Sequence, residues 1–388
     1  MESRIESKNH HRRVEACWTI HRQEVACLCC YVQTRCRDHP HFESHPVDPV
    51  DPVNFSNVAI ETLLSCLPLL LSSQQLQGAT LEYRKLGNTG LDVSVLGLGG
   101  SSLGSVFRPV EIDEAIRCVH LALDLGINLI DVAPCYGRKK AERVLGMALR
   151  HVGRHRYTLM TKVGRYGVDR FNFSARRVIK SVDQSLSRLG ADVIDVIQCH
   201  SIEFARIDQI VNETLPALET LRQQGKVRFI GVTGLPLRIF GDVLDRVPID
   251  TVLSYCHYTL NDATLQTQLD YLERKQVGII NASPLAMGLL THRGPPGWHP
   301  AGKPIRSACA RAADHCRRNG ADLAQLAIRF AVSNPRIHTT LVGTASPANI
   351  ERNVKWIDDP PDPELLEQVR RILKPVQDQT WPSGRAEA

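Results

Sequence analysis

Four side chains that can bind or transfer a proton follow three successive apolar stretches in the middle of the chain. Asp131 and Tyr136 follow the first stretch, Lys162 ends the second, and His200 ends the third. If these stretches are neighbouring parallel strands of a β/α barrel, their carboxyl ends meet at the rim where such barrels build their active sites. An aspartate and a tyrosine at this spacing mean little alone, so the prediction of a site depends on all four residues.

Together these side chains can move a proton to or from a substrate oxygen. A phenol has a reference pKa of ~10, too high for easy proton exchange at neutral pH. We expect the ammonium of Lys162 to lower the pKa of Tyr136, and Asp131 to keep that lysine charged and oriented. His200 can hold the substrate oxygen or share the proton. Such a set suits an oxygen whose carbon gains or loses a hydride.

Hydride transfer requires a cofactor, because no side chain carries a hydride. The segment HTTLVGTASPANIERNV near the C-terminus has a strand that ends at Gly343, a loop of small residues and a helix that begins near Pro347. Backbone N–H groups at such a helix start form a site for a dinucleotide pyrophosphate. An ordinary capped helix would give the same pattern, so this segment alone leaves both interpretations open.

Competing chemistries find little support in the sequence. It offers no metal triad and no Ser-His-Asp order, so no metal site is predicted. Cys135 lies next to Tyr136, but no base of its own accompanies it, and we interpret it as part of the wall of the site.

Strand and helix patterns alternate through most of the chain. Apolar stretches begin near Val93, Leu129, Tyr157, Val193, Val227, Thr251, Val277 and Thr339. Helical periodicity covers 111–125, 139–150, 174–189, 207–224, 236–246, 263–275, 305–332 with a break near Gly320, and 347–356. Glycines stand where helix C-caps belong, at Gly126, Gly190, Gly225 and Gly320.

This alternation predicts an α/β fold, a (β/α)8 TIM barrel. Eight strand–helix units in about 270 residues fit a closed barrel better than an open doubly wound sheet. A Rossmann sheet is the alternative, but Gly97-x-Gly99-Gly100 lacks its glycine spacing. The preceding segment, with turn residues at Asn88–Gly90, predicts a β-hairpin that caps the barrel and whose second arm runs from Val93 to Leu98.

We divide the chain into an extension, 1–80, the barrel, 81–378, and a tail, 379–388. The extension holds six of the twelve cysteines. Cys27-x2-Cys30 followed by Cys36-x2-His39 is similar to the ligand pattern of a metal site. Its spacing and lack of apolar periodicity favour a poorly ordered extension instead.

The composition is that of an ordinary soluble globular protein. Of 388 residues 43% are hydrophobic and 23% charged, and the net charge of +6 is spread along the chain, which argues against a nucleic-acid partner. We find no stretch long enough to span a membrane and no secretory signal, so we expect a cytosolic protein with reduced thiols. The expected partner is a small molecule, and the chain is expected to be a monomer or weak dimer.

From Leu81 to about Val376 the chain resembles the aldo-keto reductases. The blocks that carry the resemblance are YRKLGNTGLDVSVLGLGG, INLIDVAPCYG, TKVG, VIDVIQCH, GKVRFIGVTG, SPLAMGLL and LVGTASPANIERNV. The resemblance implies NAD(P)-dependent interconversion of a carbonyl and an alcohol. Asp131, Tyr136, Lys162 and His200 match the family's catalytic tetrad, with Tyr136 as the acid/base.

The blocks GVTGLPL, LSYCHYTLND, INASPLAMGLLT and GPPGWHPA are similar to the L-galactose dehydrogenase-like branch, which oxidises aldoses at C1 to lactones. That similarity implies an aldose 1-dehydrogenase acting on L-galactose or a similar aldose. The alternatives are an NADPH-dependent general carbonyl reductase and a cofactor-sensing regulatory subunit.

Three departures from the wider family bear on the cofactor site. Gly234 follows Thr233 where many members have asparagine, and Ala282 replaces a tyrosine that stacks on the nicotinamide, a role that Tyr255 is expected to take. Ala345 replaces an arginine that pairs with the 2′-phosphate of NADP, so the resemblance implies a preference for NAD, with NADP possible. The expected cofactor contacts are Thr233, Tyr255, Ser283, Leu285, Gly343, Thr344, Ala345, Ser346, Asn349 and Asn353.

Overall fold

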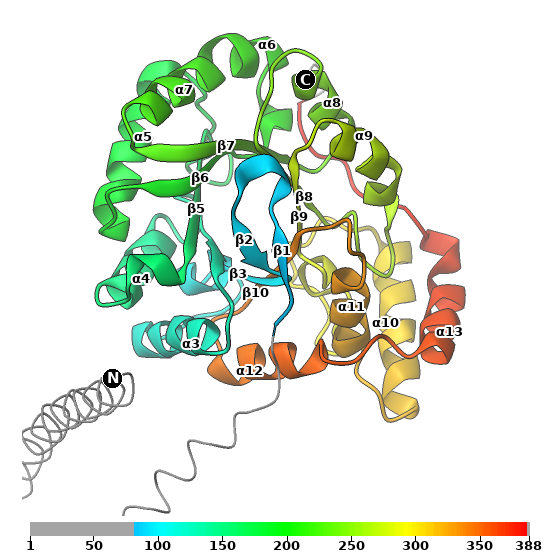
Figure 1. Ribbon diagram of the computed structural model, residues 1–388. Helices are drawn as coiled ribbons and strands as arrows, with labels where there is room; N and C mark the ends of the chain where they lie inside the picture. The colour runs from blue at the N-terminus through cyan, green and yellow to red at the C-terminus, as the bar shows by residue number, and fades with distance from the viewer. Residues whose placement is uncertain (1–80, 386–388) are drawn as a thin grey trace, which may run out of the picture. The chain divides into compact units, whose positions relative to one another are not determined.

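The structure is a computed structural model that describes residues 81–385 (Figure 1). The predictions made for residues 1–80, namely the poorly ordered extension and its weak metal-binding pattern, lie outside the described residues.

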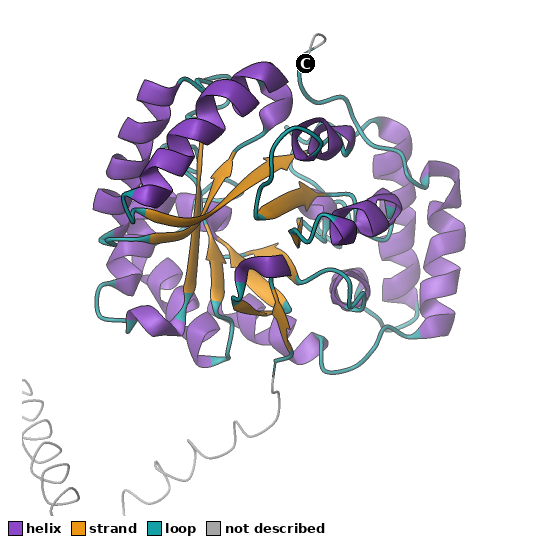
Figure 2. Cartoon of the chain, turned by 45° about the horizontal axis from the view of Figure 1, so that its top comes forward, coloured by secondary structure: helices purple, strands orange, loops and turns teal. Residues whose placement is uncertain are grey.

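Eight parallel strands close into a barrel, and the helices surround it (Figure 2). The closed order is β10-β3-β4-β5-β6-β7-β8-β9, so each strand pairs with its neighbours in the sequence and the last pairs with the first. This confirms the barrel and excludes the open Rossmann sheet. The strands are β3 Leu96–Gly99, β4 Leu129–Asp131, β5 Thr158–Val163, β6 Ile194–Cys199, β7 Val227–Gly234, β8 Thr251–Tyr255, β9 Gly278–Ala282 and β10 Thr339–Gly343.

The N-terminal hairpin closes the end of the barrel where the strands begin, opposite to their carboxyl ends. Strand β1 (Tyr83–Lys85) pairs with β2 (Asp92–Ser94), and Figure 1 shows the hairpin in front of the barrel strands. Leu86 and Val93 are fully buried against apolar side chains that fill the barrel interior, among them Met160. The hairpin therefore seals this end with apolar contact, as a capping element should.

The predicted single arm from Val93 to Leu98 is wrong in one respect, because the chain changes partner at Val95. The Val95 N–H donates to Glu82 O of the hairpin at 2.9 Å, and the Val95 carbonyl accepts from Thr340 N of β10 at 2.8 Å. One apolar run thus contributes β2 to the hairpin and β3 to the barrel.

Most helices lie where their periodicity predicts them, and the four predicted C-cap glycines all have positive φ. The predicted helix 207–224 is interrupted by a π-helical segment, Ile210–Thr214, and 263–275 begins as a 3-10 turn. The α-helices are α3 Ile112–Asp124, α4 Lys140–Leu149, α5 Ala175–Leu189, α6 Ile207–Gln209, α7 Leu215–Gln223, α8 Arg238–Leu244, α9 Leu269–Arg274, α10 Lys303–Arg318, α11 Leu323–Val332, α12 Pro347–Trp356 and α13 Pro363–Leu373.

Helix α13 was not predicted, although its start carries a clear signal. The Asp362 side chain accepts from the N–H groups of Glu364 and Leu365 at 2.9 and 3.1 Å, and Pro363 occupies the first helical position. An aspartate followed by proline is a strong helix start. The proline-rich sequence around it obscures this signal, although α13 buries Val369 and Leu373 and packs Leu365, Leu366 and Ile372 against the core.

Candidate active site

A buried ion pair connects the ends of β4 and β5. Lys162 Nζ donates to Asp131 Oδ2 at 2.5 Å and to the Val132 carbonyl at 3.0 Å, and Gln198 Nε2 donates to the other carboxylate oxygen at 3.0 Å. Burial raises the pKa of Asp131, and the Lys162 ammonium and the Gln198 amide offset only part of that rise. Gln198, one strand along the barrel, was not foreseen in this role.

Tyr136 lies beside this pair with its ring facing the lysine. Lys162 Nζ is 5.1 Å from the centre of the Tyr136 ring, and the ring of His200 meets it edge-on at 5.8 Å between centres. The structure therefore brings all four predicted residues to one place at the carboxyl ends of the strands, as parallel strand geometry requires.

The expected net lowering of the Tyr136 pKa is wrong, because the pKa is raised and Lys162 is not among the groups that shift it. Burial raises the pKa of Tyr136 well above its usual value, and the charge of Asp131 raises it further. Lys162 is paired with the Asp131 carboxylate at 2.5 Å, and the loss of solvent around the phenol is the largest effect on its pKa. The chain by itself holds Tyr136 as a protonated phenol, a proton donor.

His200 is held as a neutral imidazole next to a thiol. Burial lowers the pKa of His200 well below its usual value, and the charges of Lys162 and Arg165 lower it further. Its Nδ1 lies 3.6 Å from Cys135 Sγ, and burial raises the pKa of Cys135 to about 11. A thiol with this pKa is protonated at neutral pH, in line with a wall residue rather than a nucleophile.

Two glycines set the position of the loop that carries Tyr136. Gly104, after β3, packs so closely on this loop that a Cβ there would lie 2.8 Å from the Tyr136 carbonyl oxygen. Gly137 follows Tyr136 with φ of +56°, which favours glycine, and packs back on Gly104. The loop that carries the phenol is therefore held by close backbone contact.

Replacing Gly104 with alanine is expected to lower both stability and turnover. The extra carbon should cost about 1–3 kcal/mol of unfolding free energy. A displacement of Tyr136 near 1 Å should lower kcat on the order of a hundredfold. The matched control is Gly241→Ala in α8, where a Cβ meets nothing within 4 Å. Melting curves and kcat test this, and a Gly104→Ala enzyme with unchanged kcat would show that this contact does not hold the tyrosine.

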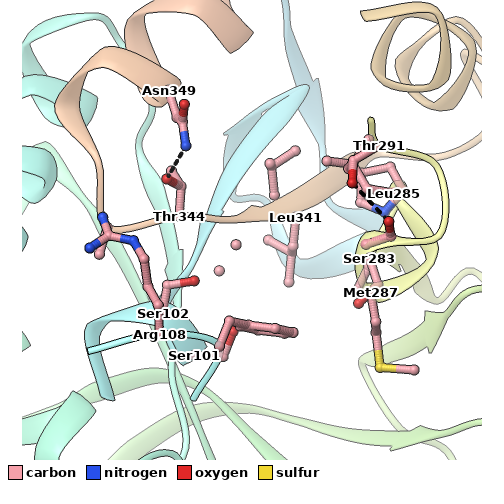
Figure 3. Close-up of a pocket in the computed structure, with 18 of the residues that line it drawn as sticks. Ser101, Ser102, Arg108, Ser283, Leu285, Met287, Thr291, Leu341, Thr344 and Asn349 are labelled. Atoms are coloured by element: carbon pink, nitrogen blue, oxygen red, sulfur yellow. Dashed lines mark hydrogen bonds between the residues drawn. The ribbon is translucent and has the colours of Figure 1, made fainter. Parts of the chain in front are cut away.

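A cavity of about 410 Å³ opens from Asp131 and Tyr136 toward the loop after β10. Figure 3 shows Ser101, Ser102 and Arg108 on one side of it and the loop from Ser283 to Thr291 on the other. Its floor has no side chains where Gly99 of β3 pairs with Gly343 of β10. This volume is within the range of small-molecule and cofactor sites.

The predicted cofactor residues divide into two groups. Those that line the cavity are Ser283, Leu285, Gly343, Thr344, Ala345 and Asn349. Thr233, Tyr255, Ser346 and Asn353 are not part of its lining. The Thr233 hydroxyl accepts from Ser201 N at 3.0 Å, which gives it a structural role beside His200.

Several lining residues were not identified from the sequence, namely Ser101, Ser102, Arg108, Met287, Thr291 and Arg293. Ser101 and Ser102 directly follow the glycines at the end of β3, so their place at the end of a barrel strand was a usable signal. Arg108 and Arg293 lie deeper in loops, and no periodicity positions a loop.

The groups that line the cavity suit a dinucleotide. The cavity reaches from the phenol at one end to the start of α12 at the other, and small residues line the path. Backbone N–H groups at a helix start favour phosphate oxygens. Within residues 81–385 there is no cluster of three side chains able to hold a metal ion. No helix in this part of the chain is long and apolar enough to cross a membrane.

An eight-stranded β/α barrel with a tyrosine, a lysine, an aspartate and a histidine at one rim is typical of oxidoreductases that use a nicotinamide cofactor. The chain belongs to the aldo/keto reductase family, whose sequence model matches residues 95–374. Members of this family use NAD or NADP.

Comparison with individual relatives shows which members of the family the chain is similar to. The chain is 51% identical to an L-galactose dehydrogenase of Arabidopsis thaliana over 313 residues, which cover 78% of this chain and 98% of the relative. It is 33% identical to a D-arabinose 1-dehydrogenase of Saccharomyces cerevisiae, over 62% of this chain and 76% of the relative. An aldo-keto reductase structure from Bacillus halodurans superposes with a TM-score of 0.66 at 26% identity, over 78% of this chain and 98% of that one.

Proposed function

We propose that this protein is an NAD(P)-dependent aldose 1-dehydrogenase that oxidises C1 of L-galactose, or of a similar aldose, to the lactone. The observation that carries the proposal is the meeting of Tyr136, His200 and the Asp131–Lys162 pair at one end of a cavity suited to a dinucleotide. The 51% identity to an L-galactose dehydrogenase, over almost the whole of that protein, supports the substrate.

In this proposal the four side chains have separate tasks. In the oxidation Tyr136 must act as the phenolate and take the proton of the C1 hydroxyl, a form that the positive charge of a bound oxidised nicotinamide would favour. Neutral His200 holds the C1 oxygen through a ring nitrogen. Lys162, fixed by Asp131 and by the Val132 carbonyl, places a cation against the tyrosine ring. When bound, the oxidised nicotinamide supplies the hydride acceptor and a positive charge in the cavity. The cofactor contacts proposed from the lining are Ser283, Leu285, Gly343, Thr344, Ala345 and Asn349.

The direct test of the proposed function is a panel of aldoses with NAD, followed by the absorbance of the reduced nicotinamide. L-galactose should be oxidised with a kcat/KM above that of aldoses with other configurations. If no aldose is oxidised while simple aldehydes are reduced, the general carbonyl reductase is the correct function.

The cysteines support the proposal of a cytosolic enzyme. All six cysteines between residues 81 and 385 are free thiols, and most are buried. Unpaired cysteines are typical of proteins kept in a reducing compartment.

We further expect NAD to be preferred over NADP by about tenfold or more in kcat/KM, because a phosphate without its charged partner loses at least one charge-assisted contact. Ala345 brings no charge to the loop after β10, and the two cations of α12 next to it, Arg352 and Lys355, are bonded within that helix. Arg352 donates to Asn349 Oδ1 at 2.6 Å, and Lys355 pairs with Glu351 at 2.9 Å.

Steady-state kinetics with both cofactors test this preference. An Ala345→Arg variant should shift it toward NADP, because the guanidinium supplies a bidentate partner for the phosphate. A tenfold advantage of the unmodified enzyme for NADP would overturn the prediction.

A further inference from the structure

Two charged residues at the catalytic rim take no part in the chemistry described above. Arg165 follows β5 three residues after Lys162, and Glu203 follows β6 three residues after His200. Both come from strands on the far side of the barrel from β9, β10 and β3, which line the cavity. They therefore lie on the side of Tyr136 and His200 that the proposed cofactor does not fill.

The loops that carry these two residues are packed on one another. Phe171 and Phe204 stack with ring centres 4.3 Å apart, and the Arg165 guanidinium lies over the Phe171 ring at 5.3 Å. Arg165 also reaches Ser201, the residue after His200, at 3.5 Å. Arg165 is thus directed along the rim toward the catalytic histidine.

The guanidinium of Arg165 is weakly satisfied. Within the described chain its hydrogen bonds go to Ser201 Oγ and to the carbonyls of Gly167 and Val168, at 3.3–3.5 Å, all uncharged oxygens at long distance. Burial dominates the pKa shifts of Tyr136, His200 and Glu203, and the Arg165 cation lowers the pKa of each of them. Its charge is therefore felt at the reacting centre.

Glu203 presents the complementary group. Its side chain is almost fully buried, and one carboxylate oxygen, Oε1, accepts from Leu235 N at 3.3 Å and from Ser383 Oγ of the C-terminal tail at 3.0 Å. The other, Oε2, has no partner among the described residues. A Cβ on Gly234 would lie 2.8 Å from Oε2, so this acceptor occupies the space that the glycine leaves at the end of β7.

We propose that Arg165 and Glu203 form a subsite that recognises the hydroxyl groups of the aldose, with Ser383 of the tail closing it. A guanidinium supplies donors and a carboxylate supplies acceptors, so the two together match hydroxyl groups, which are both. The inference rests on the proposed function and adds to it the residues that select a polyhydroxylated substrate. Sites built to bond a hydroxyl discriminate strongly against analogues that lack it.

The experiment compares Arg165→Met with Arg170→Met, an exposed arginine of the same loop. Arg165→Met should raise KM for L-galactose about ten- to a hundredfold, with kcat within a few fold of the parent enzyme. The KM for butanal, which has no hydroxyl group, should be unchanged, as should the Kd for NADH measured by fluorescence. Arg170→Met should behave as the parent. Glu203→Gln should also raise KM for L-galactose, and melting temperatures confirm that each variant folds.

The outcomes separate the inference from the proposed function. An Arg165→Met enzyme whose KM for L-galactose is within twofold of the parent overturns the subsite, and so does an equal loss with butanal. If Glu203→Gln does not fold, the comparison of Arg165→Met with Arg170→Met decides whether the subsite exists. If the parent enzyme oxidises no aldose, the proposed function fails first and the subsite fails with it.

Discussion

A Tyr136→Phe enzyme is expected to lose about a thousandfold in kcat while it folds and binds NADH as the parent does. General acid–base catalysis by one positioned group contributes about 10²–10⁴ in rate. The hydroxyl is the proton-transferring group in the proposed mechanism, and phenylalanine keeps the ring that packs against Lys162 and His200. Kinetics with L-galactose and NAD, a fluorescence titration with NADH and a melting curve measure the three quantities.

The control for this substitution is Tyr157→Phe. Tyr157 is buried and directly precedes β5, at the opposite end of that strand from Lys162, so loss of its hydroxyl should leave kcat unchanged. If Tyr136→Phe retains more than a tenth of the parent kcat, another residue is the acid/base.

The pH dependence of carbonyl reduction gives the same prediction a second test. The raised pKa of Tyr136 keeps the phenol protonated, so the rate should be flat through neutral pH and fall only in alkaline solution. His200, whose pKa is lowered, adds no step near neutrality. The Tyr136→Phe enzyme should lack the alkaline fall, because the group that titrates there is gone.

The strand ends explain why the catalytic residues were predictable. Asp131, Lys162 and His200 each end or directly follow an apolar stretch, and parallel strands in a barrel bring their carboxyl ends to one rim. The position of these residues in the sequence therefore predicted their place at the rim, without knowledge of how any loop is folded. Tyr136 follows within five residues of Asp131, too few to leave the rim.

Properties that depend on three-dimensional packing, such as pKa shifts and hydrogen-bond partners, were harder to predict from the sequence. The sequence places Lys162 near Tyr136, but the sign of the pKa shift depends on how deeply the phenol is buried and on which partner neutralises the lysine. Thr233 was expected to contact the cofactor, and nothing in the sequence indicated that its hydroxyl also accepts a hydrogen bond from Ser201 N. Both results require the distances between residues far apart in the sequence.

Long-range contacts from loops and the tail were not foreseen for a related reason. Glu203 becomes conspicuous only when Ser383, 180 residues later, is found bonded to it. Nothing in the sequence distinguishes Arg165 from the other arginines. Its place becomes clear only from the stacking of Phe171 on Phe204, which fixes the direction of its loop. Local patterns carry no information on such pairs, because periodicity describes elements and not the loops between them.

A Lys162→Met enzyme is expected to be both inactive and strongly destabilised. The Lys162 and Asp131 side chains are 2% and 5% exposed, so the substitution leaves a carboxylate without a cation where little water reaches it. Breaking a buried pair in this way costs about 3–5 kcal/mol. The control is Lys226→Met, whose pair with Asp183 has side chains 37% and 49% exposed, and which should cost at most about 1 kcal/mol.

The destabilisation of Lys162→Met should depend on pH, because the unpaired Asp131 can escape its charge by binding a proton. Holding a carboxyl of reference pKa ~3.9 protonated costs about 1.4 kcal/mol per pH unit above that value. The folded variant then binds a proton that the unfolded chain releases, so its stability falls as pH rises, by about 2.7 kcal/mol between pH 5 and pH 7. Denaturant unfolding at both pH values measures this difference against the parent.

The double variant Asp131→Asn, Lys162→Met separates the charge from the packing. With the carboxylate gone there is no proton to bind, so its stability relative to the parent should be nearly independent of pH between 5 and 7, and it should recover much of the loss of the single variant at pH 7. Its kcat should remain as low as that of Lys162→Met, because stability returns without the cation beside Tyr136. If the single variant were equally destabilised at both pH values, Asp131 would keep its charge without Lys162, and Gln198 would be its main partner.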